Sequence, residues 1–239
     1  MRTRAIIVGV SLFVLFLVVR APASLIGHFI DDRGPVSLLA LDGTLWSGKG
    51  DLLIGGVRVG RLDWSFRPVM LLKGNLGYDV GLTGTDIDVA GAVALGLGGG
   101  RTAVANGTVR APFVNIWLKP YFIELAGTFV LDEVRAEVSG RRLDTLSGTL
   151  TWDGGPLTYR MSGKLHRAAL PPMRADLGPG PEATAYAQGE ATPLLLASVE
   201  DNGFARFGVT KYLTKLVGEP WPGGDPDHAV VLEVEEQVF

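Results

Sequence analysis

Short stretches of alternating apolar and polar residues, most of them ended by glycine, aspartate or asparagine, recur along this chain. Glycine and proline, with 33 and 14 copies among 239 residues, are more frequent than a helix-rich domain tolerates. Such a chain suits short strands joined by tight turns. The pattern therefore predicts a mainly β fold, built on a long, curved and mostly antiparallel sheet.

The clearest alternation places apolar residues at Leu62, Trp64 and Phe66 with polar residues between them, which predicts a half-buried strand. Asn-Gly pairs at 106–107 and 202–203 predict two hairpin turns, because both central residues of a tight primed turn tolerate positive φ. We expect strands on both sides of each pair.

Two segments depart from the β pattern. Residues 168–190 hold four prolines with glycines between them and predict an extended loop. Residues 209–217 have apolar side chains at helical spacing, and Gly218 and Pro220 supply a stop, so we expect one short helix near the C-terminus. A final strand is predicted over residues 230–235.

The N-terminus carries Arg2 and Arg4 before an apolar run over residues 5–19. A cleaved signal peptide has this layout, and so does a short membrane anchor that Arg20 extends by snorkelling. We favour a retained anchor and keep cleavage as the alternative. The predicted order is a cytoplasmic stub (1–4), a transmembrane anchor (5–25) and an exported β domain (26–239), because basic residues stay in the cytoplasm. In a bacterium, this domain would lie in the periplasm.

The charge balance and the absence of cysteine exclude several classes of function. Residues 1–20 contain three of the 22 basic side chains and none of the 25 acidic ones, which leaves 19 against 25. An acidic remainder lacks the positive surface that nucleic acid requires. Zero cysteines exclude disulfides, thiolate zinc sites and a cysteine nucleophile.

No pattern in the chain points to catalysis, a metal or a cofactor. Three histidines are spread far apart, at His28, His166 and His228. The glycine-rich residues 96–100 lack the Gly-Lys-Ser/Thr ending of a phosphate-binding loop, so we interpret them as a turn. Asp86 and Asp88 are expected on one strand face, where solvated carboxylates are common. A Gly-x-Ser-x-Gly nucleophile motif is absent from the sequence.

The most distinctive residues are glycines, leucines and tryptophans between positions 43 and 76. They are Gly43, Thr44, Leu45, Trp46, Gly48, Leu62, Trp64, Pro68, Leu71, Leu72 and Gly74. Gly43 and Gly48 are expected to bracket a short strand, and Pro68 to end another. The two tryptophans are expected to pack on one face of the sheet, where each covers a large apolar area.

These residues resemble protein N of the bacterial type II secretion system, the general secretion pathway. The shared pattern is Gly-Thr-Leu-Trp-x-Gly, then Leu-x-Trp, then Pro followed by Leu-Leu-x-Gly-x-Leu. The Ala/Gly-rich residues 90–100 and the proline-rich segment depart from it. The resemblance implies a single-pass inner-membrane protein with a periplasmic domain, linked to the export of folded proteins across the outer membrane, and without catalytic residues.

We therefore expect a non-enzymatic scaffold that contacts other secretion components and needs no cofactor. The alternative is a periplasmic lipid-binding or lipid-transport protein. In that case an apolar trough in the sheet would hold lipid, lined by Trp46, Trp64, Leu71 and Leu72.

Overall fold

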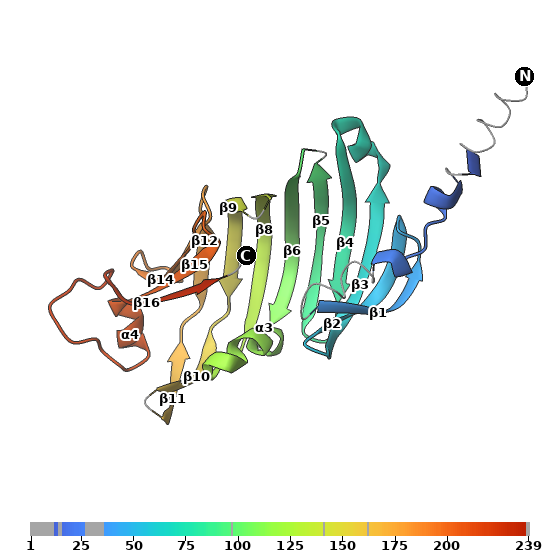
Figure 1. Cartoon of the computed structure of the whole chain (residues 1–239). Helices are drawn as coiled ribbons and strands as arrows, with labels where there is room; N and C mark the ends of the chain where they lie inside the picture. The colour runs from blue at the N-terminus through green and yellow to red at the C-terminus, as the bar shows by residue number, and fades with distance from the viewer. Residues whose placement is uncertain are drawn as a thin grey trace, which may run out of the picture.

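The protein is built on one wide, curved antiparallel sheet of 13 strands, seen in a computed structural model of the chain (Figure 1). The structure describes residues 12–13, 16–26, 36–96, 98–140, 142–161 and 163–237. The mainly β, antiparallel fold predicted from the alternation is confirmed.

The first strands of the large sheet are β1 (Val36–Gly43), β2 (Ser47–Ile54), β3 (Val57–Arg67), β4 (Asn75–Thr83), β5 (Ile87–Gly96), β6 (Gly100–Arg110), β8 (Thr128–Ser139) and β9 (Arg142–Trp152). The others are β12 (Met173–Leu177), β13 (Glu182–Ala187), β14 (Pro193–Val199), β15 (Phe204–Thr210) and β16 (Val230–Gln237). A second sheet has three strands, β7 (Ile123–Leu125), β10 (Gly155–Met161) and β11 (Lys164–Leu170). The short helices are η1 (Pro68–Lys73), α3 (Ala111–Leu118), η2 (Lys119–Tyr121) and α4 (Lys211–Leu216).

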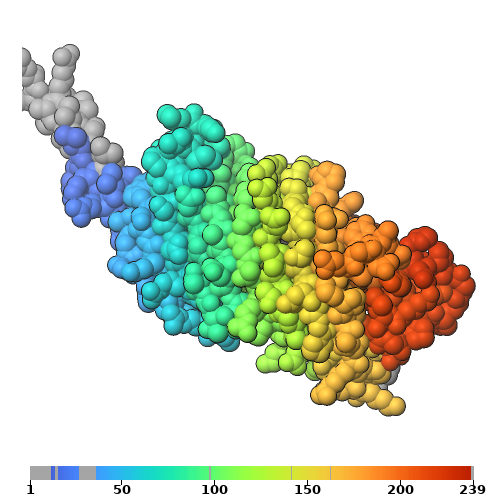
Figure 2. Space-filling view, turned by 180° about the vertical axis from the view of Figure 1, so that it is seen from behind, coloured from blue at the N-terminus to red at the C-terminus, as the bar shows by residue number. Residues whose placement is uncertain are grey.

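Most strands of the large sheet pair with the strand that precedes or follows them in the chain. The order is broken twice, where the chain leaves after β6 to form α3, η2 and β7, and after β9 to form the β10–β11 hairpin. Figure 2 shows the result from behind: the colours follow one another along the body, from blue at one end to red at the other. Position along the sheet therefore follows position in the sequence.

Few side chains are fully buried in this arrangement. Among the described residues, twelve apolar side chains are buried, and they are spread from Ala23 to Ala205 rather than gathered in one cluster. Figure 1 shows no second layer over β4 to β6 among the described residues. Much of the apolar surface of the sheet is consequently half-buried by neighbouring side chains only.

Two predicted features near the C-terminus are confirmed. The hairpin at Asn202-Gly203 joins β14 to β15, and the Asn202 side chain accepts a hydrogen bond from the Phe204 N–H at 2.9 Å. The short helix is α4, whose first turn is capped by the Thr210 hydroxyl, an acceptor for the Leu213 N–H. The final strand is β16.

The hairpin predicted at Asn106-Gly107 is wrong, because β6 runs straight through these two residues. The pairing of β6 with β8 shifts register between Ala105 and Gly107, and Gly107 has a φ of 144°. Asn106 Oδ1 accepts a hydrogen bond from the Glu133 N–H at 2.7 Å across this irregularity. The positive-φ tolerance that suits a turn serves a β-bulge here.

The loop predicted over residues 168–190 is also wrong, because the segment contains β12 and β13. Its prolines lie in the connections rather than in these strands. Pro171 and Pro172 separate β11 from β12, and Pro179 and Pro181 separate β12 from β13. Proline removes a ladder donor only where it sits inside a strand, so these positions leave the pairing intact.

The helix α3 was not predicted. Its residues are mostly apolar, with no clear polar face, and such a run resembles a buried strand as much as a helix. Asn115 ties α3 to β7, since its amide exchanges two hydrogen bonds of 2.9 Å with the backbone of Leu125. The helix thereby positions the small sheet against the large one.

The predicted cytoplasmic stub (1–4) lies outside the described residues, as do residues 5–11 and 14–15 of the predicted anchor (5–25). Residues 12–13 and 16–19 are helical. In the part of the chain that the structure describes, no helix combines the length and the apolar character needed to cross a membrane.

Candidate functional site

One face of the large sheet carries an uninterrupted row of apolar residues, here called the apolar row. Each member is the direct cross-strand partner of the next, from β3 to β16. The row is Leu62, Leu82, Val89, Gly107, Leu131, Leu150, Ala175, Ala185, Leu195, Val209 and Leu232. No member is charged or polar, so the row forms an apolar band across the sheet.

The apolar row is open to solvent. None of its members is fully buried, and Leu195 and Leu232 are exposed. An antiparallel sheet normally packs its apolar face against a second layer. Over β4 to β6 the face lacks such a layer among the described residues (Figure 1). The arrangement provides a surface that can bury an apolar partner.

The opposite face is mostly polar. Its corresponding row contains Thr83, Asp88, Thr108, Val130, Thr151, Arg174 and Tyr186. Asp86 lies one residue before β5, and its carbonyl accepts a hydrogen bond from the Arg110 N–H at 2.8 Å, which continues the pairing of Asp88 with Thr108. The Asp86 carboxylate forms an ion pair with Arg110 at 3.7 Å.

Near β9 to β15 the apolar face is hollowed into a cavity of about 340 Å³. Phe129 and Trp152 stack at its wall, with ring centroids 5.9 Å apart. Leu170 of β11 and Leu213 of α4 also line the cavity, which brings residues of the small sheet and of α4 to the apolar face. Every side chain of the lining is apolar, so the cavity suits a hydrocarbon group rather than a charged ligand.

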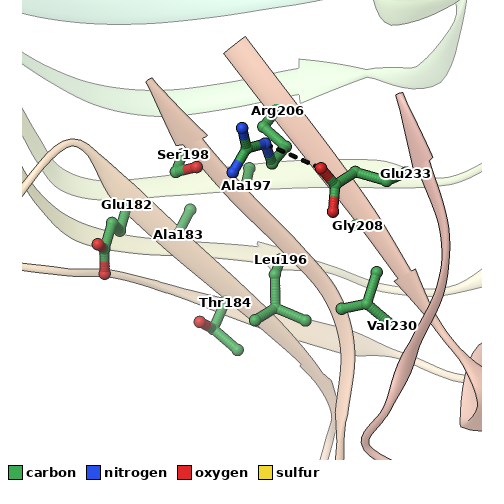
Figure 3. A pocket seen from close by; sticks show the side chains of 10 residues that line it. All are labelled: Glu182, Ala183, Thr184, Leu196, Ala197, Ser198, Arg206, Gly208, Val230 and Glu233. Atoms are coloured by element: carbon green, nitrogen blue, oxygen red, sulfur yellow. Dashed lines mark ion pairs between the residues drawn. The ribbon is translucent and has the colours of Figure 1, made fainter. Parts of the chain in front are cut away.

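A second hollow, of about 290 Å³, surrounds Arg206 on the polar face (Figure 3). The Arg206 guanidinium forms ion pairs with Glu200, Glu233 and Glu235 at 2.6 to 2.9 Å. The hydrogen bond to Glu235 and the charges of the other carboxylates raise the pKa of Arg206. Because three carboxylates already surround this cation, its role is to join β15 to β16 rather than to bind an anion.

The predicted absence of a histidine cluster can be compared with the structure only in part, since His28 lies outside the described residues. His166 pairs with Glu219 at 2.8 Å and stacks on Tyr159. The Tyr159 hydroxyl is buried and finds no hydrogen-bond partner among the residues that the structure describes, and burial raises its pKa. Within the described ranges, no group of three or more histidine and carboxylate side chains is arranged to hold a metal ion.

The Gly-Thr-Leu-Trp motif forms the turn between β1 and β2. The predicted strand between Gly43 and Gly48 is wrong, because these two residues pair with each other across the hairpin. Gly43 adopts a φ of 99°, and the Thr44 hydroxyl accepts hydrogen bonds from the N–H groups of Trp46 and Ser47. The Leu45 N–H donates to the Ala21 carbonyl at 2.8 Å, so this turn also holds the N-terminal segment, whose described residues are 12–13 and 16–26.

The two tryptophans of the motif have different surroundings. Trp64 is buried on β3, and its indole N–H donates to the Thr44 carbonyl at 3.1 Å. Trp46 lies in the turn, where its ring packs on Phe66 with centroids 4.9 Å apart. The Trp46 indole N–H donates to the Val18 carbonyl at 2.8 Å. The pair thus joins the sheet edge to the N-terminal segment.

The other motif residues lie on β3 and in η1. Leu62 belongs to the apolar row, Pro68 begins η1 and Gly74 ends it. Leu71 and Leu72 are exposed in η1 and do not belong to the apolar row. None of the four residues expected to line a trough, Trp46, Trp64, Leu71 and Leu72, is a member of the apolar row. The members of the row are aligned by strand register, which the alternation within one strand does not determine.

A family model described as type II secretion system (T2SS), protein N, matches residues 34–214. The match begins just before β1 and ends within α4, so it covers most of the large sheet. No curated protein and no solved structure matches the chain.

Proposed function

Because this chain belongs to the type II secretion system protein N family, we propose that it is a non-enzymatic, inner-membrane-anchored component of that system. Membership of the family implies a role in type II secretion and association with other components of the system. The finer proposal is that the N-terminal segment holds the sheet in the periplasm, where it acts as a scaffold in the export of folded proteins across the outer membrane.

The apolar row is the observation that supports a scaffold. Its eleven members form an uncharged band, and none of them is fully buried. Burying apolar area contributes about 25 cal/mol per Å², so a partner that covers several of these side chains gains several kcal/mol before the costs of association. The sheet offers a partner surface, and no bond chemistry is required.

The sheet edges supply a second kind of contact. Among the described strands, β1 pairs only with β2 and β16 only with β15, so these two strands are the edges of the sheet. An extended segment of another component can add to such an edge through main-chain hydrogen bonds. Strand addition and docking on the apolar row are compatible, because they use different atoms of the same sheet.

Two substitutions on opposite faces of β14 test the scaffold proposal. Leu195→Gln places an amide in the apolar row, and Ser198→Gln places the same amide on the polar face. In cells that carry the full secretion system, Leu195→Gln should lower both secretion and the recovery of cross-linked components, while Ser198→Gln leaves both near wild type. Equal behaviour of the two variants would remove the apolar row from the proposal.

The apolar cavity favours lipid binding as a second candidate function. A volume of about 340 Å³ lined only by apolar side chains accommodates part of an acyl chain. Lipids extracted from the purified full-length protein should then contain phospholipid in stoichiometric amounts by mass spectrometry. Leu195→Gln should reduce that amount, and Ser198→Gln should not. A lipid-free extract would leave the scaffold as the better proposal.

A further inference from the structure

The connection η1 presents three apolar side chains to solvent. Val69 is 66% exposed, Leu71 52% and Leu72 88%. The value for Leu72 is the highest among the large apolar side chains that the structure describes. Single exposed apolar residues are ordinary, but three in one short turn form a continuous apolar tip.

The tip is held in a fixed conformation. Met70 packs on Gly77 of β4. A Cβ on residue 77 would lie only 2.5 Å from Met70 Cγ, so the close contact requires glycine there. Gly74 closes η1 with a φ of 71°, and its N–H donates to the Leu71 carbonyl at 3.0 Å. Residues three apart share a side of a 3₁₀ helix, so Val69 and Leu72 point the same way while Met70 faces the sheet.

The tip lies at the end of the sheet to which the N-terminal segment is attached. Val18 accepts the hydrogen bond from Trp46, Trp46 packs on Phe66, and Phe66 lies two residues before η1. Figures 1 and 2, which view the protein from opposite sides, both show η1 and the N-terminal segment at this end. Two apolar elements that are distant in sequence are therefore neighbours on one end of the molecule.

The N-terminal segment is itself apolar and open. Its described residues Leu12, Phe13, Phe16, Leu17, Val18 and Val19 are 47 to 62% exposed. Aromatic rings lie between this segment and η1, because Phe66 packs on Trp46 and on Tyr78, with centroids 4.9 and 5.4 Å apart.

Two cations flank these apolar elements. Arg20 belongs to the N-terminal segment and lies over the Phe16 ring at 5.7 Å, and Lys73 ends η1. Neither forms an ion pair with a carboxylate among the described residues. Apolar side chains next to aromatic rings and unpaired cations are the arrangement found at a membrane–water interface.

We propose that η1 is a second membrane contact, in which Val69, Leu71 and Leu72 enter the phospholipid bilayer that receives the N-terminal segment. Lys73 and Arg20 then lie at the level of the lipid phosphates. This inference rests on the proposed attachment to the inner membrane and adds a consequence to it: two contacts fix the direction of the strands relative to the bilayer, whereas one anchor would let the sheet rotate.

A fluorophore attached to one introduced cysteine tests the contact. The natural sequence contains no cysteine, so each variant is labelled at one position only. The full-length Leu72→Cys variant is labelled with an environment-sensitive fluorophore and reconstituted into vesicles of phosphatidylethanolamine and phosphatidylglycerol. Val57→Cys is the matched control, since Val57 is 56% exposed and lies at the opposite end of β3. Lipids that carry a nitroxide on the acyl chain report which probe is in the bilayer.

The probe at position 72 should shift to shorter wavelength and be quenched at least threefold more strongly than the probe at position 57. Equal, water-like signals from both positions in vesicle-bound protein would overturn the second contact and leave the anchor intact. A chain that fails to float with vesicles would overturn the contact together with the anchor. Neither result depends on secretion, which the Leu195→Gln comparison tests separately.

Discussion

The indole of Trp64 lies directly over Gly48, its partner in the β2–β3 pair. A Cβ on residue 48 would lie 2.5 Å from Cζ2 of this ring and 2.6 Å from the Asp42 carbonyl oxygen. Since neither the ring nor the backbone can move freely, the hairpin that carries the Gly-Thr-Leu-Trp motif requires a residue without a side chain here. The motif glycine is explained by space rather than by backbone angle.

Gly48→Ala should therefore destabilise the protein by about 1–3 kcal/mol, the usual cost of adding a methyl group where there is no room. Chemical unfolding followed by circular dichroism measures this loss. Gly98→Ala is the control, because a Cβ on Gly98 meets no atom within 4 Å. A Gly48→Ala variant as stable as the control would show that the Trp64 ring is not fixed as described.

Trp46→Phe should release the N-terminal segment while the sheet stays folded. The variant keeps an aromatic ring against Phe66 but loses the hydrogen bond to the Val18 carbonyl. A net loss of about 0.5–1.5 kcal/mol corresponds to a roughly 2- to 12-fold rise in tryptic cleavage after Arg20. Trp117→Phe changes an exposed tryptophan elsewhere and should leave the cleavage rate unchanged.

Acid should remove a stabilising contribution of Asp144 in the β8–β9 hairpin. Hydrogen bonds from Ser139 and from Arg142, the latter at 2.7 Å, lower the pKa of Asp144 below its ordinary value of 3.8. A lowered folded-state pKa means that the ionised form stabilises the fold above pH 3.8, and that this stabilisation disappears as the pH falls through the lower value.

The melting temperature of Asp144→Asn should accordingly lie below that of wild type at pH 7, and the two should converge in acid. Thermal melts at intervals between pH 7 and about pH 2 measure the difference. Asp132→Asn, a change at an exposed residue of β8 without an ion pair among the described residues, should show no such convergence. A gap that persists in strong acid would mean that the carboxylate charge is not responsible.

Lys211→Met should loosen the segment that joins α4 to β16. Lys211 is buried, and its ammonium donates to the carbonyls of Gly223 and Asp225 at 2.6 and 2.9 Å. Methionine keeps the apolar stem but leaves these carbonyls unpaired, at a cost of about 1–3 kcal/mol. Hydrogen exchange over residues 218–229 should become faster. Lys215→Met removes only an exposed ion pair with Asp227 and should have a much smaller effect.

Strands with one apolar and one polar side could be predicted, as Leu62, Trp64 and Phe66 illustrate on β3, whereas β12 and β13 were hidden by the prolines around them. The Asn-Gly pairs show where local information ends. At 202–203 the pair makes a hairpin, and at 106–107 the same two residues make a bulge inside β6. Both uses need positive φ, and only the pairing with β8 decides between them.

The candidate site was less accessible from sequence than the fold. The apolar row depends on register, and bulges shift that register within β8 and β9, so no single strand reveals which residues align. The motif tryptophans lie on the first hairpin and on β3, whereas most members of the apolar row lie on the strands after them. The exposure of Leu72 likewise depends on a tertiary contact, because Met70 packs on Gly77 and leaves Leu72 on the solvent side of η1.

A sheet whose strands follow chain order and whose ends do not meet has no fixed circumference. Each strand adds about 4.8 Å, so thirteen strands reach roughly 60 Å from first to last. Inserting or deleting one hairpin near the middle changes that reach by about 10 Å and leaves both ends as they were. The distance between the two ends of the sheet can therefore change in steps of two strands, while the surfaces at both ends are conserved.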